Sequence, residues 1–204
     1  MKTSLILPVF ILLMLFSAKA SSQACTLTCP PNIVIKADST KGGTKVNYAQ
    51  ATSTGECGLV TYTPASGSFF KVGSSSVIVS SASGQRCSFT VTVTDNEAPS
   101  ISPLVFSTPR LWPANGKIKE VGVFYNMADN ADSTSCVLTV SSNDVDVNGG
   151  WEVVNSHLVR LKAARLPDGR PRVYTVAASC TDAAGNVSRR SRTISVAKNY
   201  GKKK

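Results

Sequence analysis

The stretch FTVTVT, residues 89–94, is the clearest structural signal in the sequence. Phe89, Val91 and Val93 alternate with threonines, so a β-strand here would place apolar side chains on one face and hydroxyls on the other. Other strand-like runs recur at short intervals between turns rich in Gly, Ser, Asn and Pro, and no stretch shows a sustained period of 3.6 residues. The sequence therefore predicts an all-β fold built of sandwiches.

A break in this pattern divides the chain into two parts. The segment Asp95-Asn96-Glu97-Ala98-Pro99 ends the first series of strands, and a second series follows it. The sequence predicts two tandem β-sandwich domains, 21–98 and 99–198, and a basic tail at 199–204. The turn Pro167-Asp168-Gly169 is expected to join two strands of the second domain. Strands are expected within 46–48, 59–63, 69–73, 77–79 and 89–94, and then within 121–127, 136–141, 151–154, 158–163, 173–180 and 187–196.

The N-terminus, residues 1–20, has the features of a secretory signal peptide. Lys2 precedes an apolar run from Leu5 to Phe16, and Ala18-Lys19-Ala20 is a small-x-small cleavage site. This run is shorter than the roughly 20 residues that span a bilayer, and no second such run follows it. The sequence predicts a secreted, extracellular protein, with the periplasm as the alternative, and no transmembrane segment after cleavage.

All six cysteines lie beyond the expected cleavage site, and an even number in an exported chain indicates disulfides. Four precede residue 98 and two follow it, which restricts the fifteen pairings that six cysteines allow. Neither a Cys-x-x-Cys motif nor a Cys/His zinc spacing is present, and the single histidine, His157, excludes an all-histidine metal site. The sequence predicts no catalytic thiol, no zinc site and no cofactor.

Four segments of the first domain form a recognisable series. In chain order they are Cys29-Pro30-Pro31-Asn32-Ile33, Val46-Asn47-Tyr48, Gly67 to Gly73 and Cys87 to Pro99. In these segments and in their order the first domain resembles the hyalin repeat (HYR) family. The resemblance implies a sandwich similar to immunoglobulin and fibronectin type III domains, found in non-enzymatic extracellular proteins of the adhesion type.

The second part of the chain, residues 104–197, contains three further segments of this kind: Leu111 to Lys117, Trp151 to Val154 and Thr181 to Asn186. In these segments it is similar to the immunoglobulin-like modules that follow HYR domains in secreted bacterial proteins. This similarity implies two tandem immunoglobulin-like or fibronectin III-like sandwiches.

This architecture indicates which cysteines meet. The first and last strands of a seven-strand sandwich run parallel, which brings the first and last segments of the HYR domain together, and their cysteines form the usual disulfide of that family. The remaining cysteines of each domain are expected at a common end of its sandwich. The expected pairs are Cys29–Cys87, Cys25–Cys57 and Cys136–Cys180.

Positive charge is concentrated at the C-terminal end of the chain. Residues 157–204 contain 12 basic and 2 acidic residues. Such a surface attracts acidic polysaccharide, an anionic lipid surface or extracellular nucleic acid, whereas export argues against genomic DNA. The alternative is a solvated surface whose charges block strand aggregation. Strand pairing is expected to bring Arg160, Lys162 and some of Arg189, Arg190 and Arg192 onto one face. The candidate anion-binding residues are Arg160, Lys162, Arg165, Arg170, Arg172, Arg189, Arg190 and Arg192.

Carboxylates at the domain junction form a candidate calcium site, because Asp95-Asn96-Glu97 is similar to the calcium-binding linkers of cadherin-like modules. Calcium needs six to eight oxygens, so loops of the second domain would have to contribute. The alternative is a hydrogen-bonded turn, and no other metal site is expected. The candidate ligands are Asp95 and Glu97 with the loop residues Asp129, Asp132 and Asp182.

A few other side chains are candidates for sugar binding or catalysis. Trp112 and Trp151 are candidates for stacking on sugar rings, with core packing as the alternative. The sequence has no Gly-x-Ser-x-Gly nucleophile elbow. Asp144 and Asp146 are two residues apart, and no cleft is indicated between opposed carboxylates. The sequence therefore does not predict an enzyme, although a hydrolase would have to use His157 or this carboxylate pair.

Together these features predict a secreted, non-enzymatic adhesion or interaction protein of the cell exterior. It would bind an extracellular protein, or an anionic polysaccharide or surface, through sandwich loops and a basic C-terminal face. The alternative function is a carbohydrate-binding accessory module of an extracellular polysaccharide-processing system.

Overall fold

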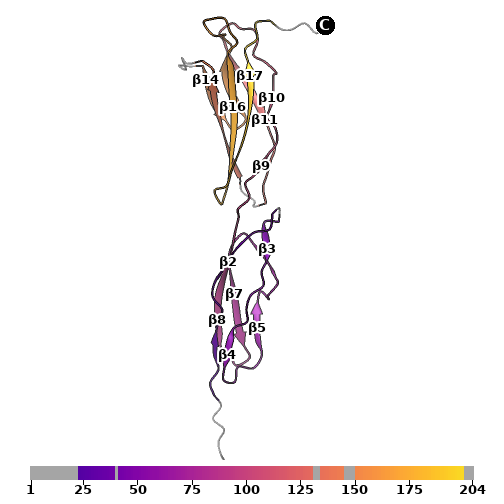
Figure 1. Cartoon of the computed structure of the whole chain (residues 1–204), viewed down its shortest axis with the longest axis vertical. Coiled ribbons are helices and arrows are strands. Elements are labelled where there is room, and N and C mark those ends of the chain that lie inside the picture. The colour runs from indigo at the N-terminus through magenta and orange to yellow at the C-terminus, as the bar shows by residue number, and fades with distance from the viewer. Residues whose placement is uncertain (1–22, 40, 131–133, 145–149, 200–204) are drawn as a thin grey trace, which may run out of the picture.

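The computed structural model describes residues 23–39, 41–130, 134–144 and 150–199. Within these ranges the chain contains strands and no helix, which confirms the expected all-β class. Figure 1 shows two groups of strands stacked end to end and joined by a single extended linker. The signal peptide expected at 1–20 lies outside the described residues.

The first sandwich contains strands β1 to β8. Its largest sheet has the order β2-β8-β7-β5, in which β2 runs parallel to β8 and the other neighbours are antiparallel. The smaller pairs are β1 with β4 and β3 with β6. The strand bounds are β1 (Thr26–Thr28), β2 (Ile33–Lys36), β3 (Gly43–Lys45), β4 (Thr52–Thr54), β5 (Val60–Thr63), β6 (Phe69–Lys71), β7 (Gly73–Ser81) and β8 (Arg86–Thr94).

The core of the first sandwich is small. The alternating run forms most of β8, and its Phe89, Val91 and Val93 are buried as the period of two predicts. Tyr48 packs edge-on against Phe89, with ring centroids 5.0 Å apart. A strand is expected at 46–48, but the nearest strand of the structure is β3, which ends just before these residues, at Lys45. The seven buried core residues are Val46, Phe70, Val77, Val79, Phe89, Val91 and Val93.

The second sandwich contains strands β9 to β17. Its two main sheets have the orders β10-β11-β15-β14 and β13-β16-β17, and β9 pairs with β12. A parallel bridge joins Leu111 to Val196. The strand bounds are β9 (Ser100–Ile101), β10 (Val105–Phe106), β11 (Ile118–Phe124), β12 (Met127–Ala128), β13 (Thr134–Ser142), β14 (Trp151–Asn155), β15 (Leu158–Lys162), β16 (Val173–Asp182) and β17 (Val187–Ser195).

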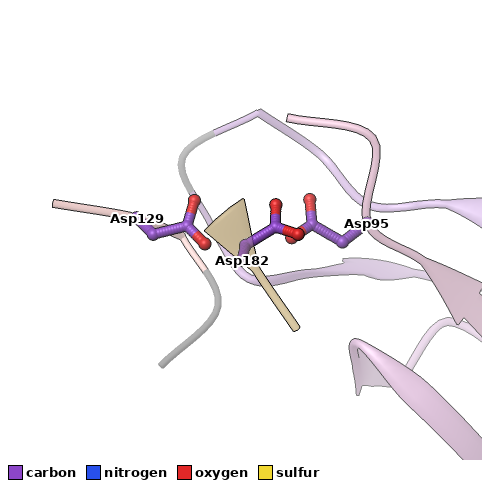
Figure 2. Close-up of side chains that lie close together, drawn as sticks. All are labelled: Asp95, Asp129 and Asp182. Atoms are coloured by element: carbon purple, nitrogen blue, oxygen red, sulfur yellow. The ribbon is translucent and has the colours of Figure 1, made fainter. Parts of the chain in front are cut away.

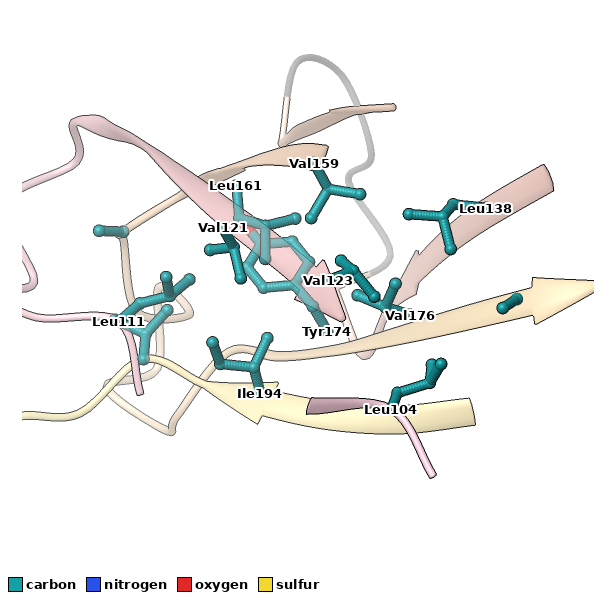
Figure 3. Close-up of a cluster of buried hydrophobic side chains, with 13 residues drawn as sticks. Leu104, Leu111, Val121, Val123, Leu138, Val159, Leu161, Tyr174, Val176 and Ile194 are labelled. Carbon is teal, nitrogen blue, oxygen red and sulfur yellow. The ribbon is translucent and has the colours of Figure 1, made fainter. Parts of the chain in front are cut away.

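Tyr174 lies at the centre of the second core, surrounded by aliphatic side chains from both sheets (Figure 3). Its hydroxyl lies 3.0 Å from the Gly150 carbonyl oxygen and 2.9 Å from the Lys162 carbonyl oxygen, and its single proton is donated to one of them or shared between the two. These bonds satisfy a phenol that is fully removed from solvent. The core comprises thirteen buried residues, which share none with the core of the first sandwich.

The turn around Pro167-Asp168-Gly169 connects β15 to β16, as expected. These two strands nevertheless lie in different sheets, so the turn carries the chain across the sandwich and does not form a hairpin. The Leu166 amide donates to the Arg170 carbonyl, and Gly169 has a φ of 80°. Glycine adopts this left-handed conformation without steric cost.

Three disulfides cross-link the sandwiches, with the expected pairing. Their Cα–Cα distances are 4.7, 5.8 and 4.1 Å for Cys25–Cys57, Cys29–Cys87 and Cys136–Cys180. Cys29 and Cys87 meet at the start of the parallel β2–β8 pair, whereas Cys136 and Cys180 lie directly opposite each other on β13 and β16. Each bridge restricts the unfolded chain and thereby stabilises the fold.

The described residues form no helix that is long and apolar enough to cross a membrane.

Candidate functional site

Three carboxylates converge where the two sandwiches meet. Asp95 follows β8 in the linker, Asp129 follows β12, and Asp182 is the last residue of β16. Each offers one oxygen, and these oxygens lie within 4.8 Å of one another. Figure 2 shows the three carboxylates pointing toward one another from separate segments of the chain. Residues from the linker and from the second sandwich therefore build one acidic cluster.

The turn after β16 fixes the position of Asp182. The Asn186 backbone and side-chain amides donate to the two carboxylate oxygens of Asp182, both at 2.8 Å. Burial raises the pKa of Asp182, but the hydrogen bonds from Asn186 and from the backbone of the turn outweigh it, so the pKa lies below its ordinary value. Asp182 is only 7% exposed, and it stays charged at neutral pH.

Contacts on both sides of the cluster tie the linker to the second sandwich. The Asn186 amide also donates to the Asp95 carbonyl oxygen at 3.5 Å, and the Asn130 amide donates to Glu97 Oε2 at 3.3 Å. Gly42, in a loop of the first sandwich, approaches the Asn130 carbonyl so closely that a Cβ would collide with it. The linker and the first sandwich therefore both contact Asn130, which lies in the second sandwich next to the cluster.

Two side-chain oxygens beside the cluster are buried without a hydrogen-bond donor among the described residues. They are Asp95 Oδ2 and Asn130 Oδ1. The other carboxylate oxygen of Asp95 accepts from the Glu97 amide at 3.0 Å. Buried oxygens are normally hydrogen-bonded or bound to a cation. A hard cation such as Ca²⁺ binds to carboxylate and amide oxygens, so these two oxygens and the three carboxylates are suitable ligands for it.

The dimensions of the cluster fit calcium. Ca²⁺–O distances of about 2.3–2.6 Å place ligands on opposite sides of one ion roughly 5 Å apart, and the cluster oxygens lie within 4.8 Å. Asp95, Asp129 and Asp182 are thus able to share one ion. Glu97 is not part of this cluster, but it lines an adjacent open pocket of about 290 Å³ together with Asn130 and with Asp129 of the cluster. Asp132 lies outside the described residues.

Among the basic candidates, Arg160 and Arg172 are held by acidic partners. Arg160 lies on β15 and donates to Glu120 on β11 at 3.0 Å and to Glu152 on β14 at 3.2 Å, the two strands that flank β15. Hydrogen bonds to Glu120 and then Glu152 raise the pKa of Arg160. Arg172 donates to Asp144, and the side chains are 11% and 10% exposed. Their charges are compensated within the second sandwich.

Arg165 and Arg170 organise the turn between β15 and β16. Arg165 donates to the carbonyl oxygens of Gly169 and, at 3.3 Å, of Val196. Arg170 forms an ion pair with Asp168 at 2.6 Å. Hydrogen bonds from the Arg170 backbone and side chain lower the pKa of Asp168. These two arginines therefore have structural contacts that account for their positions.

The expectation that Arg160 and Lys162 share a face with Arg189, Arg190 and Arg192 is wrong. The first two residues lie on β15 and the other three on β17, and these strands belong to different sheets. The connection between β15 and β16 crosses from one sheet to the other, which separates the two groups of charges.

The candidate residues for sugar binding and hydrolysis are not gathered in one place. Trp151 packs against the second core, with its ring 6.2 Å from that of Tyr174 in an edge-on arrangement. Trp112 is 44% exposed. His157 stacks on Tyr125, with ring centroids 4.8 Å apart. Asp144 is in the ion pair with Arg172, and Asp146 lies outside the described residues.

Sequence reasoning missed two residues of the junction. Asn130 bonds Glu97 and contacts the first sandwich, and Asn186 holds both Asp182 and the linker. The pairs Asp129-Asn130 and Gly185-Asn186 were available as signals, because Asx side chains often hydrogen-bond neighbouring backbone in turns.

Comparison with known families matches residues 22–93 to the HYR domain. No curated protein sequence matches the chain. Among solved structures it is similar to protocadherin gamma B7 extracellular cadherin domains 1–4, with 15% identity, 84% of this chain and 49% of that chain covered, and a TM-score of 0.38. It is also similar to protocadherin gamma B2 extracellular cadherin domains 3–6, with 12% identity, 85% of this chain and 47% of that chain covered, and a TM-score of 0.34. A third similar structure is the human desmocollin-1 ectodomain, with 15% identity, 89% of this chain and 38% of that chain covered, and a TM-score of 0.28. The chain spans about half or less of the length of these structures.

Proposed function

We propose that the protein is a secreted, non-enzymatic adhesion or interaction protein of the cell exterior, because residues 22–93 match the HYR domain. It presents loops and basic side chains to an extracellular protein, or to an anionic polysaccharide or surface. Three disulfides support a location outside the reducing cytoplasm. The HYR resemblance also supports a binding role, because the family is a non-enzymatic one.

The junction is the observation that carries this proposal. Two sandwiches joined end to end hold their outer loops far apart, and this separation is useful for binding only if the linker keeps them aligned. Asn186 and Asn130 bond the linker to the second sandwich, and Gly42 contacts Asn130 from the first. These contacts support a stiff module that spaces or presents binding surfaces.

Calcium at the acidic cluster would strengthen this alignment. The linker supplies Asp95 and the second sandwich supplies Asp129 and Asp182, so one ion bound by all three would bridge the two parts of the chain. It would also relieve the repulsion between the three carboxylates and give Asp95 Oδ2 a partner. A ligand that binds only the folded state, at a concentration of 100 times its Kd, stabilises that state by about 2.7 kcal/mol.

Calorimetry with and without calcium tests the junction. We expect millimolar Ca²⁺ to raise the Tm of the oxidised mature protein, and Asp95→Asn or Asp129→Asn to weaken Ca²⁺ binding at least tenfold. Asp168→Asn is the matched control, because Asp168 is an exposed turn carboxylate held by Arg170. Equal responses of all three variants to Ca²⁺ would show that the ion acts on general surface charge and would contradict the site.

A binding experiment tests the adhesive role itself. The oxidised mature protein is immobilised and exposed to the envelope fraction and the culture medium of the producing cell. We expect saturable retention of an envelope or matrix component, competed by free protein and lost after the disulfides are reduced. Retention no greater than that of the reduced protein would contradict the proposal.

The exposure of Trp112 keeps the alternative function open to test. A carbohydrate-binding module stacks sugar rings on exposed aromatic side chains, and Trp112 is 44% exposed whereas Trp151 packs against the core. Binding to neutral glycans that is lost in Trp112→Ala would favour this function over the adhesive one. Unchanged binding in that variant would remove it.

A further inference from the structure

The disulfide of the second sandwich lies beside the acidic cluster. Cys180 and Asp182 are two residues apart on β16, and both side chains are buried on the same face of this strand. Cys136, which is bonded to Cys180, lies opposite it on β13. The next residue pair on that face joins Thr134 to Asp182. The covalent bond is therefore one step along the strand from a carboxylate of the cluster.

The end of β16 depends on this bond for its attachment to β13. Asp182 is the last residue of β16 that pairs with β13, and the pairing of β16 with β17 ends one residue earlier, at Thr181. The ends of strands open locally at a small cost in free energy. Asn186 fixes the Asp182 carboxylate within the turn, but the strand that carries this turn is held to β13 by the disulfide.

A second carboxylate of the cluster is connected to the same disulfide through a methionine. Met127 Sδ lies 3.2 Å from Cys136 Sγ, and Asp129 follows two residues after Met127. Strand β12, which carries Met127, pairs with β9 over two residues, so the contact between the sulfur atoms adds to a short ladder. Asp129 and Asp182 therefore adjoin strands that meet at one group of sulfur atoms.

The spacing of these carboxylates determines how tightly they bind an ion. The oxygens of the cluster lie within 4.8 Å of one another, which suits one calcium ion between them. Asp95 Oδ2 and Asn130 Oδ1 are buried beside them without a donor among the described residues. The ligands are thus gathered before an ion binds. Because the apparent Kd is the intrinsic Kd divided by the fraction of molecules in the competent arrangement, any loosening of this arrangement weakens binding.

We propose that the Cys136–Cys180 disulfide positions the acidic cluster, so that the oxidised protein binds calcium tightly and releases it when small thiols reduce this bond. The inference rests on the calcium-bridged junction of the proposed function and adds its regulation. The coupling is reciprocal: if the disulfide raises the affinity for calcium by some factor, calcium stabilises the disulfide by the same factor. The redox state outside the cell thereby controls whether an ion bridges the linker and the second sandwich.

Reduction can begin at the more accessible sulfur. Cys136 is half-buried whereas Cys180 is fully buried, so the thiolate of a reductant attacks Cys136 Sγ. The S–S bond breaks, and Cys180 leaves as a thiolate that takes a proton from water. With a dithiol, the second thiol of the reagent then displaces Cys136. The protein gains two electrons and two protons, and the reagent becomes a disulfide.

Calcium titration of a variant without the disulfide tests the positioning role. We expect Cys136→Ala/Cys180→Ala to raise the Kd for Ca²⁺ at least tenfold in isothermal titration calorimetry, which corresponds to a competent fraction of about one tenth or less. Val176→Ala is the matched control, because Val176 is buried on β16 six residues before Asp182 and its truncation destabilises the same strand. We expect this control to change the Kd less than about twofold.

The titrations separate the inference from the calcium site on which it rests. A Kd of Cys136→Ala/Cys180→Ala within twofold of the wild type would overturn the inference. An equal rise in Val176→Ala would overturn it as well, because calcium binding would then follow general stability. In both cases the calcium site stands if the wild type binds Ca²⁺ and Asp95→Asn weakens this binding. If the wild type binds no Ca²⁺, the calcium site and the inference fail together.

A measurement on the wild-type protein does not depend on the folding of any variant. The oxidised mature protein is equilibrated with mixtures of reduced and oxidised dithiothreitol, in saturating Ca²⁺ or in EGTA. Free thiols are then alkylated and assigned by peptide mass spectrometry. A tenfold coupling makes the reduction potential of Cys136–Cys180 about 30 mV more negative in Ca²⁺.

Cys25–Cys57 is the internal control of this measurement, because it follows β4 at the far end of the first sandwich (Figure 1). We expect its reduction potential to be the same in Ca²⁺ and in EGTA. Equal shifts of both disulfides, or no shift of Cys136–Cys180, would overturn the inference.

Discussion

The two sandwiches are stabilised in different proportions by burial and by cross-links. Among the described residues, the first has seven buried core residues and two disulfides, whereas the second has thirteen buried core residues and one disulfide. The paired strands next to these disulfides also differ in length. β2 and β8 share four residue pairs, whereas β13 and β16 share nine. A small domain buries too little surface to be stable unaided. The comparison indicates that covalent bonds matter most where the core is smallest.

Removing one disulfide from each sandwich is the strongest test of this comparison. Loop-closure entropy alone gives about 4 kcal/mol for either Cys29–Cys87 or Cys136–Cys180, because their sequence separations, 58 and 44, differ little. The size of the hydrophobic core must therefore determine which sandwich stays folded without its disulfide. We expect Cys29→Ala/Cys87→Ala to unfold the first sandwich at 37 °C, and Cys136→Ala/Cys180→Ala to leave the second folded at a lower Tm.

Hydrogen exchange resolved by peptide assigns the loss to one sandwich or the other. If the second sandwich unfolds without its disulfide while the first survives without Cys29–Cys87, the comparison is wrong.

The buried ion pair of the second sandwich gives the next largest effect. Asp144→Ala leaves Arg172 charged and nearly buried, at 11% exposure, and is expected to destabilise the second sandwich by about 3–5 kcal/mol. Asp144→Ala/Arg172→Met is expected to lose less, because no unpaired charge remains. Denaturant unfolding of the three proteins measures this. A double variant less stable than the single one would show that the pair itself, and not the uncompensated charge, is what matters.

Acid distinguishes the two sandwiches through Asp182. Hydrogen bonds from Asn186 hold the pKa of this carboxyl below its ordinary value despite burial. Its contribution to stability is therefore complete above the unfolded pKa of about 3.9 and is lost as the pH falls through the folded pKa. We expect the Tm of the second sandwich to decrease when the pH falls below about 4. Asp182→Asn should weaken this pH dependence, and an unchanged acid profile in that variant would contradict the role of Asp182.

The smallest expected effect concerns the exposed charges of β15. Arg160→Gln removes the contacts to Glu120 and Glu152, but exposed ion pairs contribute little to stability. We expect the Tm of the second sandwich to shift by less than about 4 °C. A larger fall would mean that surface charge, and not only the larger core, stabilises this sandwich.

The positions of the long strands could be predicted from the sequence, but their assignment to sheets could not. Alternation located β8 because its two faces differ in polarity. The short strands β1, β4, β9 and β10 have two or three residues each, too few to show a period. The turn at 167–169 has the same chemistry whether it forms a hairpin or crosses the sandwich, so the separation of β15 from β16 had no local signal.

The acidic cluster could be anticipated only in part. Asp95, Asp129 and Asp182 were recognisable as carboxylates in or near turns, but their proximity depends on how the sandwiches stack. Glu97 resembled a ligand equally well in sequence, and its bond from Asn130 distinguishes it. The basic residues show the same limit, because strand alternation does not reveal which arginines find carboxylate or carbonyl partners.

The position of Cys29–Cys87 determines how the protein would transmit a pulling force. Tension applied at the N-terminus reaches Cys29 before the first long sheet, crosses the covalent bond to Cys87 and continues along β8 into the linker. Residues 30–86 lie outside this load path, so the first sandwich cannot lengthen by unravelling. That end of the molecule would therefore be nearly inextensible, and any extension under load would have to come from the junction or the second sandwich.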